Sequence, residues 1–164
     1  MEYVYVGKIT STHGIKGELK IKSYFKYKDL VFKKNNIIYI DKEPYKITSY
    51  RPHKGFDMVT INNFDDINVV LKYIGKGVYI DKNSTYLSDK YLDEDLIGMD
   101  VYYDNKYIGK VTDIVDAGSN NILIKLEHIY IPYNSHFVSS IDKDKKIIFI
   151  VNAGELGLWI LKKN

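Results

Sequence analysis

The chain has 164 residues and no cysteine; the length suits one medium domain or two small ones, and the composition excludes disulfide scaffolds, thiol catalysis and cysteine-ligated metals. No apolar run approaches the roughly 18 residues of a membrane-spanning helix, and the start of the chain lacks the features of a secretory signal, so we expect a cytoplasmic protein without membrane contact. Residues 1–85 carry 15 basic and 9 acidic side chains, whereas residues 86–164 carry 9 and 12. This asymmetry suggests a basic module that contacts an anionic partner, with ordinary solvated surface as the alternative.

Short runs typical of β-strands dominate the first half of the chain. In the second of these runs, Leu19 and Ile21 alternate with Lys20 and Lys22, which is the period of two of a half-buried strand. The expected strands are 3–6, 19–24, 37–40, 45–50, 57–61 and 78–80.

One helix and one domain boundary follow these strands. The helix is expected over residues 66–74, with Asp65 as its N-cap and Gly75 as its stop. Between residues 81 and 95 the chain is polar and the sign of its net charge changes, which indicates a linker. We therefore predict a first domain at 1–82, a linker at 83–94 and a second domain at 95–164.

The second half repeats the pattern of short strands separated by turns. Strands at a spacing near ten residues favour small sandwiches or barrels over units in which strands and helices alternate. The expected strands are 100–103, 106–115, 122–126, 129–132 and 147–151.

The segment 7–19 places three glycines between two strand-like runs. Glycine suits positions where φ is positive or another surface approaches the backbone closely. Residues 14–17 have the Gly-x-x-Gly form of a KH-domain clamp, but they join strands instead of helices, and no Walker phosphate loop is present. Two interpretations stay open: an ordinary connecting loop, or an exposed platform that directs Lys8, His13 and Lys16 at an anionic partner.

Arg51 is the only arginine among 24 basic residues, and it begins a second basic cluster at 51–55. Only a guanidinium offers a rigid planar fork that binds phosphate or carboxylate through two parallel hydrogen bonds. Pro52 lacks a backbone donor and favours an extended Arg51, so we expect an exposed strand end. The cluster, with His53 and Lys54, is either a binding loop or a solubilising turn.

The sequence contains no catalytic or metal-binding signature. Its four histidines form no His-Glu-x-x-His pair, and residues 142–144 lack the later glycine and glutamate of a calcium loop, so a turn is expected there. No serine lies in a nucleophile elbow, and the acidic pairs at 65–66 and 94–95 fit helix caps and linkers better than acid/base dyads. We therefore predict no enzyme activity, no metal, no cofactor and no small-molecule substrate.

A third pattern lies in the second half, at residues 95–101, 108–111 and 131–133. Gly98 would allow a turn into a strand, and Pro132 implies a sheet edge or a bulge. These residues fit a self-contained barrel core, although exposed aromatic side chains near the linker would suit an interface.

The three patterns, in this order, resemble the ribosome maturation factor RimM family nearly end to end. Before the second domain, Tyr91 matches the first of two tyrosines of the family, whereas Leu92 replaces the second. The first half carries the resemblance at residues 6–21, 51–55 and 66–75, and the second half resembles a PRC-barrel at residues 95–98, 108–111, 131–133 and 137–138.

The resemblance implies an all-β protein made of two small β-barrels, a translation-factor-like six-stranded barrel and a PRC-barrel, with one or two short helices. It also implies a non-catalytic, monomeric factor that binds the immature small ribosomal subunit at its head and assists late assembly and rRNA processing. The implied partners are small-subunit rRNA and small-subunit ribosomal protein nineteen. Two alternatives stay open: a protein adaptor with little rRNA contact, and an rRNA-processing nuclease.

Residues from the three patterns are the candidate contacts with these partners. The candidate rRNA- and ribosome-binding residues are Lys8, His13, Gly14, Lys16, Gly17, Arg51, His53 and Lys54. The candidate protein-interface residues are Tyr91, Gly98, Pro132, Tyr133 and Phe137.

Overall fold

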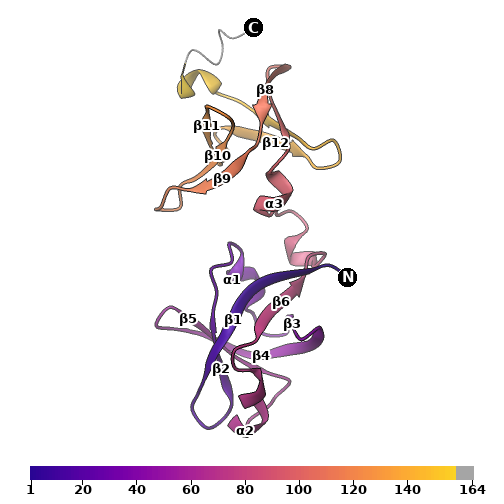
Figure 1. Cartoon of the computed structure of the whole chain (residues 1–164), viewed down its shortest axis with the longest axis vertical. Coiled ribbons are helices and arrows are strands. Elements are labelled where there is room, and N and C mark those ends of the chain that lie inside the picture. The colour runs from indigo at the N-terminus through magenta and orange to yellow at the C-terminus, as the bar shows by residue number, and fades with distance from the viewer. Residues whose placement is uncertain (158–164) are drawn as a thin grey trace. The chain divides into compact units, whose positions relative to one another are not determined.

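The computed structural model describes residues 1–157 and contains two compact units, Met1–Asp89 and a second that begins at Lys90 (Figure 1). Residues 158–164 of the expected second domain lie outside the described residues. Both units consist mainly of strands joined by turns and short helical segments, so the predicted all-β class is confirmed.

The first unit is a closed six-stranded barrel. Its strands are β1 (Tyr3–His13), β2 (Glu18–Lys22), β3 (Ile37–Ile40), β4 (Glu43–His53), β5 (Phe56–Ile61) and β6 (Gly77–Asp81). They pair in the order β1-β2-β5-β4-β3-β6, and every neighbouring pair is antiparallel. Each strand therefore has a partner on both sides.

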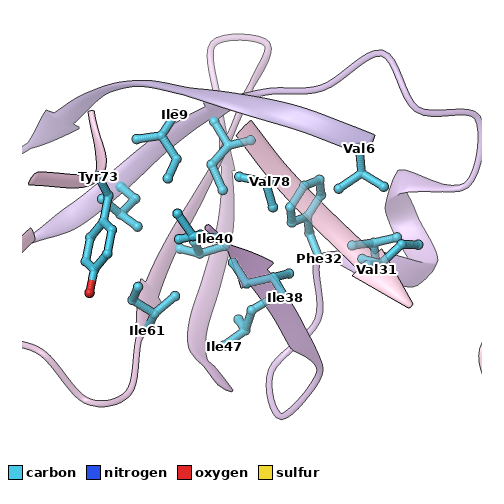
Figure 2. Close-up of a cluster of buried hydrophobic side chains, with 14 of the residues drawn as sticks. Val6, Ile9, Val31, Phe32, Ile38, Ile40, Ile47, Ile61, Tyr73 and Val78 are labelled. Atoms are coloured by element: carbon cyan, nitrogen blue, oxygen red, sulfur yellow. The ribbon is translucent and has the colours of Figure 1, made fainter. Parts of the chain in front are cut away.

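The interior of this barrel is filled by the inward-facing half of each strand. Leu19 and Ile21 of β2 are fully buried, whereas the lysines that alternate with them are partly exposed. The register pairs Ile9 with Ile21 and Leu19 with Val59, which brings inward side chains of neighbouring strands together. Figure 2 shows the resulting cluster, which is mainly aliphatic and also holds Phe32 and Tyr73. Burial of each large side chain contributes about 1.5–3 kcal/mol, so this cluster is the main stabilising element of the unit.

The expected helix over 66–74 is shorter and begins differently. It consists of α2 (Ile67–Val70) and a following 3-10 turn, Leu71–Tyr73. Asp66, with an extended backbone, caps it by accepting a hydrogen bond from the backbone N–H two residues later. The prediction of Asp65 as the N-cap was therefore wrong by one residue. The other helical segments of the unit are α1 (Lys28–Val31), which the sequence did not reveal, and a 3-10 turn at Thr85–Leu87.

The second unit contains two small sheets around its own core. Its strands are β7 (Asp100–Tyr103), β8 (Lys106–Lys110), β9 (Asp113–Asp116), β10 (Ile122–Lys125), β11 (Tyr130–Pro132), β12 (Val138–Asp142) and β13 (Ile147–Ile150). One sheet has the order β12-β13-β7-β8, with β13 and β7 parallel, and the other has the order β11-β10-β9. Val101 and Ile148 from the first sheet and Ile124 and Ile131 from the second share one buried cluster, so the two sheets enclose a common barrel-like core.

The expected single strand over 106–115 is divided between the two sheets. The backbone N–H of Val111 donates to the carbonyl of Met99, beside the first sheet, whereas that of Thr112 donates to the carbonyl of Lys125, in the second. The chain therefore changes sheets between two consecutive residues. Strand β12, which the sequence did not reveal, completes the first sheet, and a turn at 143–146 joins it to β13, close to the expected turn.

Helix α3 (Asp93–Leu96) begins the second unit, and the acidic pair at 94–95 contributes to its cap. The Asp95 carboxylate accepts a hydrogen bond from the backbone N–H of Leu92 at 3.0 Å. This contact fits the capping role expected for the pair. A 3-10 turn at Ala153–Leu156 ends the described part of the unit.

Candidate functional site

The two basic motifs of the first half lie on adjoining strands of the barrel. His13 at the end of β1 pairs with Glu18 of β2, and both Lys20 of β2 and Arg51 of β4 pair with Met58 of β5. Met58 faces away from the core residue Val59 that follows it, yet it is fully buried. We infer that the long side chains of its cross-strand neighbours cover it.

Arg51 is engaged by a carboxylate of the same barrel. Its Nε donates to Glu18 Oε2 at 2.8 Å and its terminal nitrogen donates to Glu18 Oε1 at 2.7 Å, a bidentate pair. The hydrogen bond lowers the pKa of Glu18 and raises that of Arg51. The expected guanidinium fork is therefore present, but a carboxylate of the chain already occupies two of its donors, and a phosphate would use the others or displace Glu18.

Two histidines from different motifs lie beside this pair. The rings of His13 and His53 are 5.4 Å apart between centroids. Loss of hydration, together with the positive charges of Arg51 and Lys54, lowers the pKa of His53. Both rings also contribute to the low pKa of Glu18 when they are charged. The structure therefore brings together four of the predicted residues from segments about 40 positions apart. These residues are His13, Arg51, His53 and Lys54.

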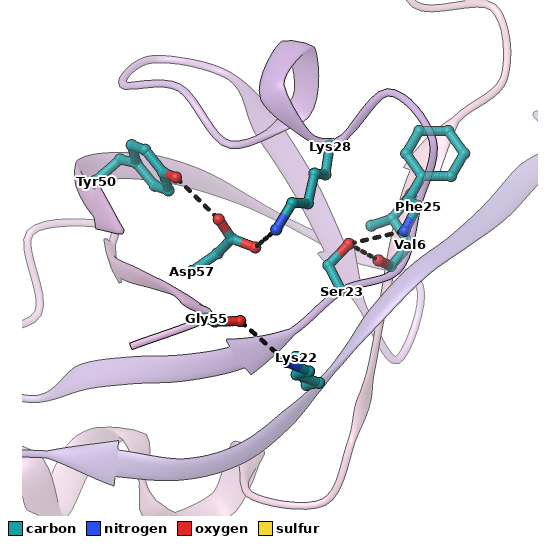
Figure 3. Close-up of polar contacts among 8 residues, drawn as sticks. All are labelled: Val6, Lys22, Ser23, Phe25, Lys28, Tyr50, Gly55 and Asp57. Atoms are coloured by element: carbon teal, nitrogen blue, oxygen red, sulfur yellow. Dashed lines mark hydrogen bonds and ion pairs between the residues drawn. The ribbon is translucent and has the colours of Figure 1, made fainter. Parts of the chain in front are cut away.

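The tip of the β4–β5 hairpin carries Lys54. Lys54 and Gly55 have φ values of 49° and 81°, which is the pattern of a two-residue type I′ turn. The Nζ of Lys22 donates to the carbonyl of Gly55 at 3.1 Å (Figure 3). The ammonium groups of Lys20 and Lys22 lie 4.1 Å and 4.9 Å from the centre of the Phe56 ring. The hairpin is thus held against β2 by cation–π contacts and one hydrogen bond.

The glycine-rich turn between β1 and β2 is fixed by the start of α2. Gly17 has φ of 85°, and a Cβ there would lie 3.1 Å from the carbonyl oxygen of Asp66. The backbone N–H of Ile67 donates to the carbonyl of Ile15 at 3.0 Å. Lys16 is exposed in this turn, two residues from Glu18. Gly14, with φ of 72°, has open space around it, so its role is to permit the turn.

Lys8 lies nearer the start of β1 than His13, which ends the strand. It is exposed on β1, and its cross-strand partner is Lys22 of β2. Lys22 in turn donates to the carbonyl of Gly55 at the hairpin tip.

A buried polar network anchors the same hairpin beneath its basic surface. Asp57 is 3% exposed, and its carboxylate accepts from Tyr50 Oη at 2.8 Å and from Lys28 Nζ at 3.2 Å (Figure 3). Burial and then the contact with Asp57 raise the pKa of Tyr50 to about 12. Because both carboxylate oxygens are occupied by internal donors, we interpret Asp57 as a structural anchor between α1, β4 and β5.

The predicted interface residues of the second unit largely pack against its own core. Tyr91, Tyr133 and Phe137 are partly buried and contact the buried cluster. Pro132 ends β11, opposite Leu123 in β10. Gly98 has φ of 91° with open space around it, and its backbone N–H donates to the carbonyl of Val111. These contacts give all five a structural role.

Sequence reasoning missed four residues of the first site: Glu18, Lys20, Lys22 and Phe56. The alternation of β2 could have indicated three of them, since Glu18, Lys20 and Lys22 share one face of a strand whose other face is buried. The pairing of Glu18 with Arg51 joins positions 33 apart and has no local signal.

Within residues 1–157, no group of three or more histidine, aspartate or glutamate side chains is arranged to hold a metal ion. No helix in the described residues is long and apolar enough to cross a membrane.

Family models match both units. Residues 4–85 match the RimM N-terminal domain and residues 93–156 match the RimM PRC barrel domain. A protein of Exiguobacterium sp. named "Ribosome maturation factor RimM" is 37% identical over 161 residues, covering 92% of this chain and 94% of that protein. A protein of the same name from Ligilactobacillus salivarius is 41% identical over 131 residues, covering 76% and 78%. A crystal structure of a 16S ribosomal RNA processing protein RimM from Pseudomonas aeruginosa is 19% identical, with a TM-score of 0.47, and covers 94% and 99%.

Proposed function

Because this chain belongs to the ribosome maturation factor RimM family, we propose that it binds the immature small ribosomal subunit at its head and assists late assembly and rRNA processing without catalysis. The proposed partners are small-subunit rRNA and small-subunit ribosomal protein nineteen. We place this activity in the cytoplasm and assign it to a monomer.

The basic surface around the β4–β5 hairpin is the observation that supports rRNA contact. Arg51, His13 and His53 lie together there, and Lys20 and Lys54 are close enough to lower the pKa of His53. Cationic side chains release counterions when they neutralise phosphates, which supplies most sequence-independent affinity for RNA. A factor of this kind acts by binding one conformation of its partner more tightly than another, so binding alone can favour the mature conformation of the head.

Co-sedimentation with free small subunits over a series of salt concentrations tests this proposal. We expect affinity to fall steeply with salt, and the triple variant Lys16→Gln, Arg51→Gln and Lys54→Gln to flatten the slope by up to about 2–3. The control variant replaces the exposed Lys33, Lys34 and Lys42 of the same unit with glutamine, so it loses the same charge. Equal slopes for the two triple variants would mean that the rRNA-binding surface lies elsewhere.

The second unit is the proposed site of contact with protein nineteen. It exposes Tyr107, Tyr130 and Phe149 by 52%, 50% and 38%, and exposed aromatic side chains are typical of protein interfaces. We propose that the face around Pro132, Tyr133 and Phe137 contributes to this contact. Full binding to isolated protein nineteen with weak dependence on salt would instead favour a protein adaptor. Cleavage of precursor rRNA by the pure protein with magnesium would overturn the absence of catalysis.

A further inference from the structure

An open groove of about 470 Å³ lies on the first barrel, between the first half of β1 and the end of β2. Its volume falls in the range of about 300–1,000 Å³ that is usual for ligand sites. The residues that line it include aromatic and basic side chains but no acidic one. The lining includes Val6, Gly7, Lys8, Lys22, Tyr24 and Phe25.

Two lysines on adjacent strands line this groove. Lys8 and Lys22 are direct cross-strand partners of β1 and β2, and like charges directly opposite each other destabilise a sheet. An anion between them would remove the repulsion. Lys22 keeps donor capacity for such an anion, because its ammonium has three N–H bonds and donates to the carbonyl of Gly55.

The backbone holds the walls of the groove in place. Ser23, 5% exposed, donates from Oγ to the carbonyl of Val6 and accepts from the backbone N–H of Phe25 at 3.2 Å (Figure 3). A Cβ at Gly7 would lie 2.9 Å from the carbonyl oxygen of Lys22, so the two strands approach too closely there for any other residue. The position of the chain on either side of Tyr24 is therefore fixed.

Tyr24 offers a flat aromatic surface beside the lysines. Its side chain is 88% exposed, and the Nζ of Lys22 lies 5.3 Å from the centre of its ring. An exposed ring next to a cation suits a ligand that is both planar and anionic. A nucleotide has this combination, since bases stack on aromatic side chains and phosphates bind lysines.

We propose that this groove binds one unpaired nucleotide of single-stranded RNA, with the base against Tyr24 and a phosphate between Lys8 and Lys22. The inference rests on the proposed function and deepens it, because it names the RNA feature that the first barrel would hold. An acidic peptide would satisfy the two lysines, but it would leave the exposed ring without a planar partner.

Fluorescence anisotropy of the full chain with a labelled single-stranded RNA oligonucleotide, measured over a series of salt concentrations, tests the proposal. Tyr24→Leu keeps an apolar side chain but removes the aromatic face, and we expect about tenfold weaker binding. Tyr24→Phe keeps the face and should bind within about twofold of the unchanged protein. Lys8→Gln should lower the salt slope by about 0.7, whereas Tyr24→Leu should leave the slope unchanged.

Lys33→Gln is the matched control for Lys8→Gln, because this exposed lysine of the same unit does not line the groove, and it should lower the salt slope less than Lys8→Gln does. Equal affinities of Tyr24→Leu and Tyr24→Phe would overturn the proposal, and so would equal competition by duplex RNA or by polyglutamate of the same charge. Tyr24 is highly exposed, so its replacement leaves the core unchanged, and circular dichroism checks that each variant keeps its fold. Failure of the unchanged protein to co-sediment with small subunits would refute the proposed function while leaving oligonucleotide binding as a separate result.

Discussion

The variant Asp57→Ala tests whether the buried polar network fixes the β4–β5 hairpin. The Asp57 carboxylate is 3% exposed and accepts hydrogen bonds from Tyr50 and Lys28. A hydrogen bond to a charged group contributes about 1.5–3 kcal/mol. The Lys28 side chain is 35% exposed and can return to water, and Tyr50 is half-buried, so we take the lower figure for each bond and expect a loss of about 3 kcal/mol in the free energy of unfolding.

The loss in free energy of unfolding is measured for the first unit alone by urea unfolding, with hydrogen exchange of peptides from β4 and β5 as the probe. The exposed Asp41 provides the control, and Asp41→Asn should change the free energy by no more than about 0.5 kcal/mol. In a Tyr50→Phe background, Asp57→Ala should cost less than it does in the unchanged protein, because one of its two contacts is already absent. An equal cost in both backgrounds, or a loss below about 1 kcal/mol, would refute the structural interpretation of this network.

Three further predictions concern the same barrel. The pKa of about 12 for Tyr50 means that its contribution to stability is complete below pH 10 and is lost as the pH rises through about 12; alkaline unfolding of Tyr50→Phe should lack this loss. Gly17→Ala should destabilise the barrel by about 1–3 kcal/mol in urea unfolding, since φ is positive and the Cβ would lie 3.1 Å from the Asp66 carbonyl oxygen. Glu18→Gln removes the carboxylate that occupies Arg51, so affinity for small subunits at low salt should rise, and a fall would show that Glu18 positions Arg51 for binding.

The barrel of the first unit was predictable because local patterns agree with its tertiary structure. The alternation in β2 gave the buried Leu19 and Ile21, and turn residues marked the ends of most strands. The division of 106–115 into two strands was not predictable, because it depends on which sheet offers a hydrogen-bond partner to Val111 and to Thr112.

In the candidate site, too, features set by neighbouring residues were predictable and contacts between distant segments were not. The positive φ of Gly17 follows from its place in a tight turn, and the structure adds that a Cβ there would crowd the carbonyl oxygen of Asp66 at 3.1 Å. The bidentate contact of Arg51 with Glu18 depends on the order β2-β5-β4, and a single sequence contains no record of that order. The sequence shows that Arg51 is a cation, whereas only the fold shows that Glu18 is the anion bound to it.

The six strands form a closed barrel, and this closure limits the possible roles of the lysines on β2. In an open sheet, lysines on an outermost strand often prevent unwanted addition of a strand from another molecule. Here β2 lies between β1 and β5, so its backbone groups already form hydrogen bonds with both neighbouring strands. No side chain is needed to block the addition of another strand. Lys20 and Lys22 are therefore not needed to prevent strand addition. Their contacts with the hairpin and recognition of a partner remain as their roles.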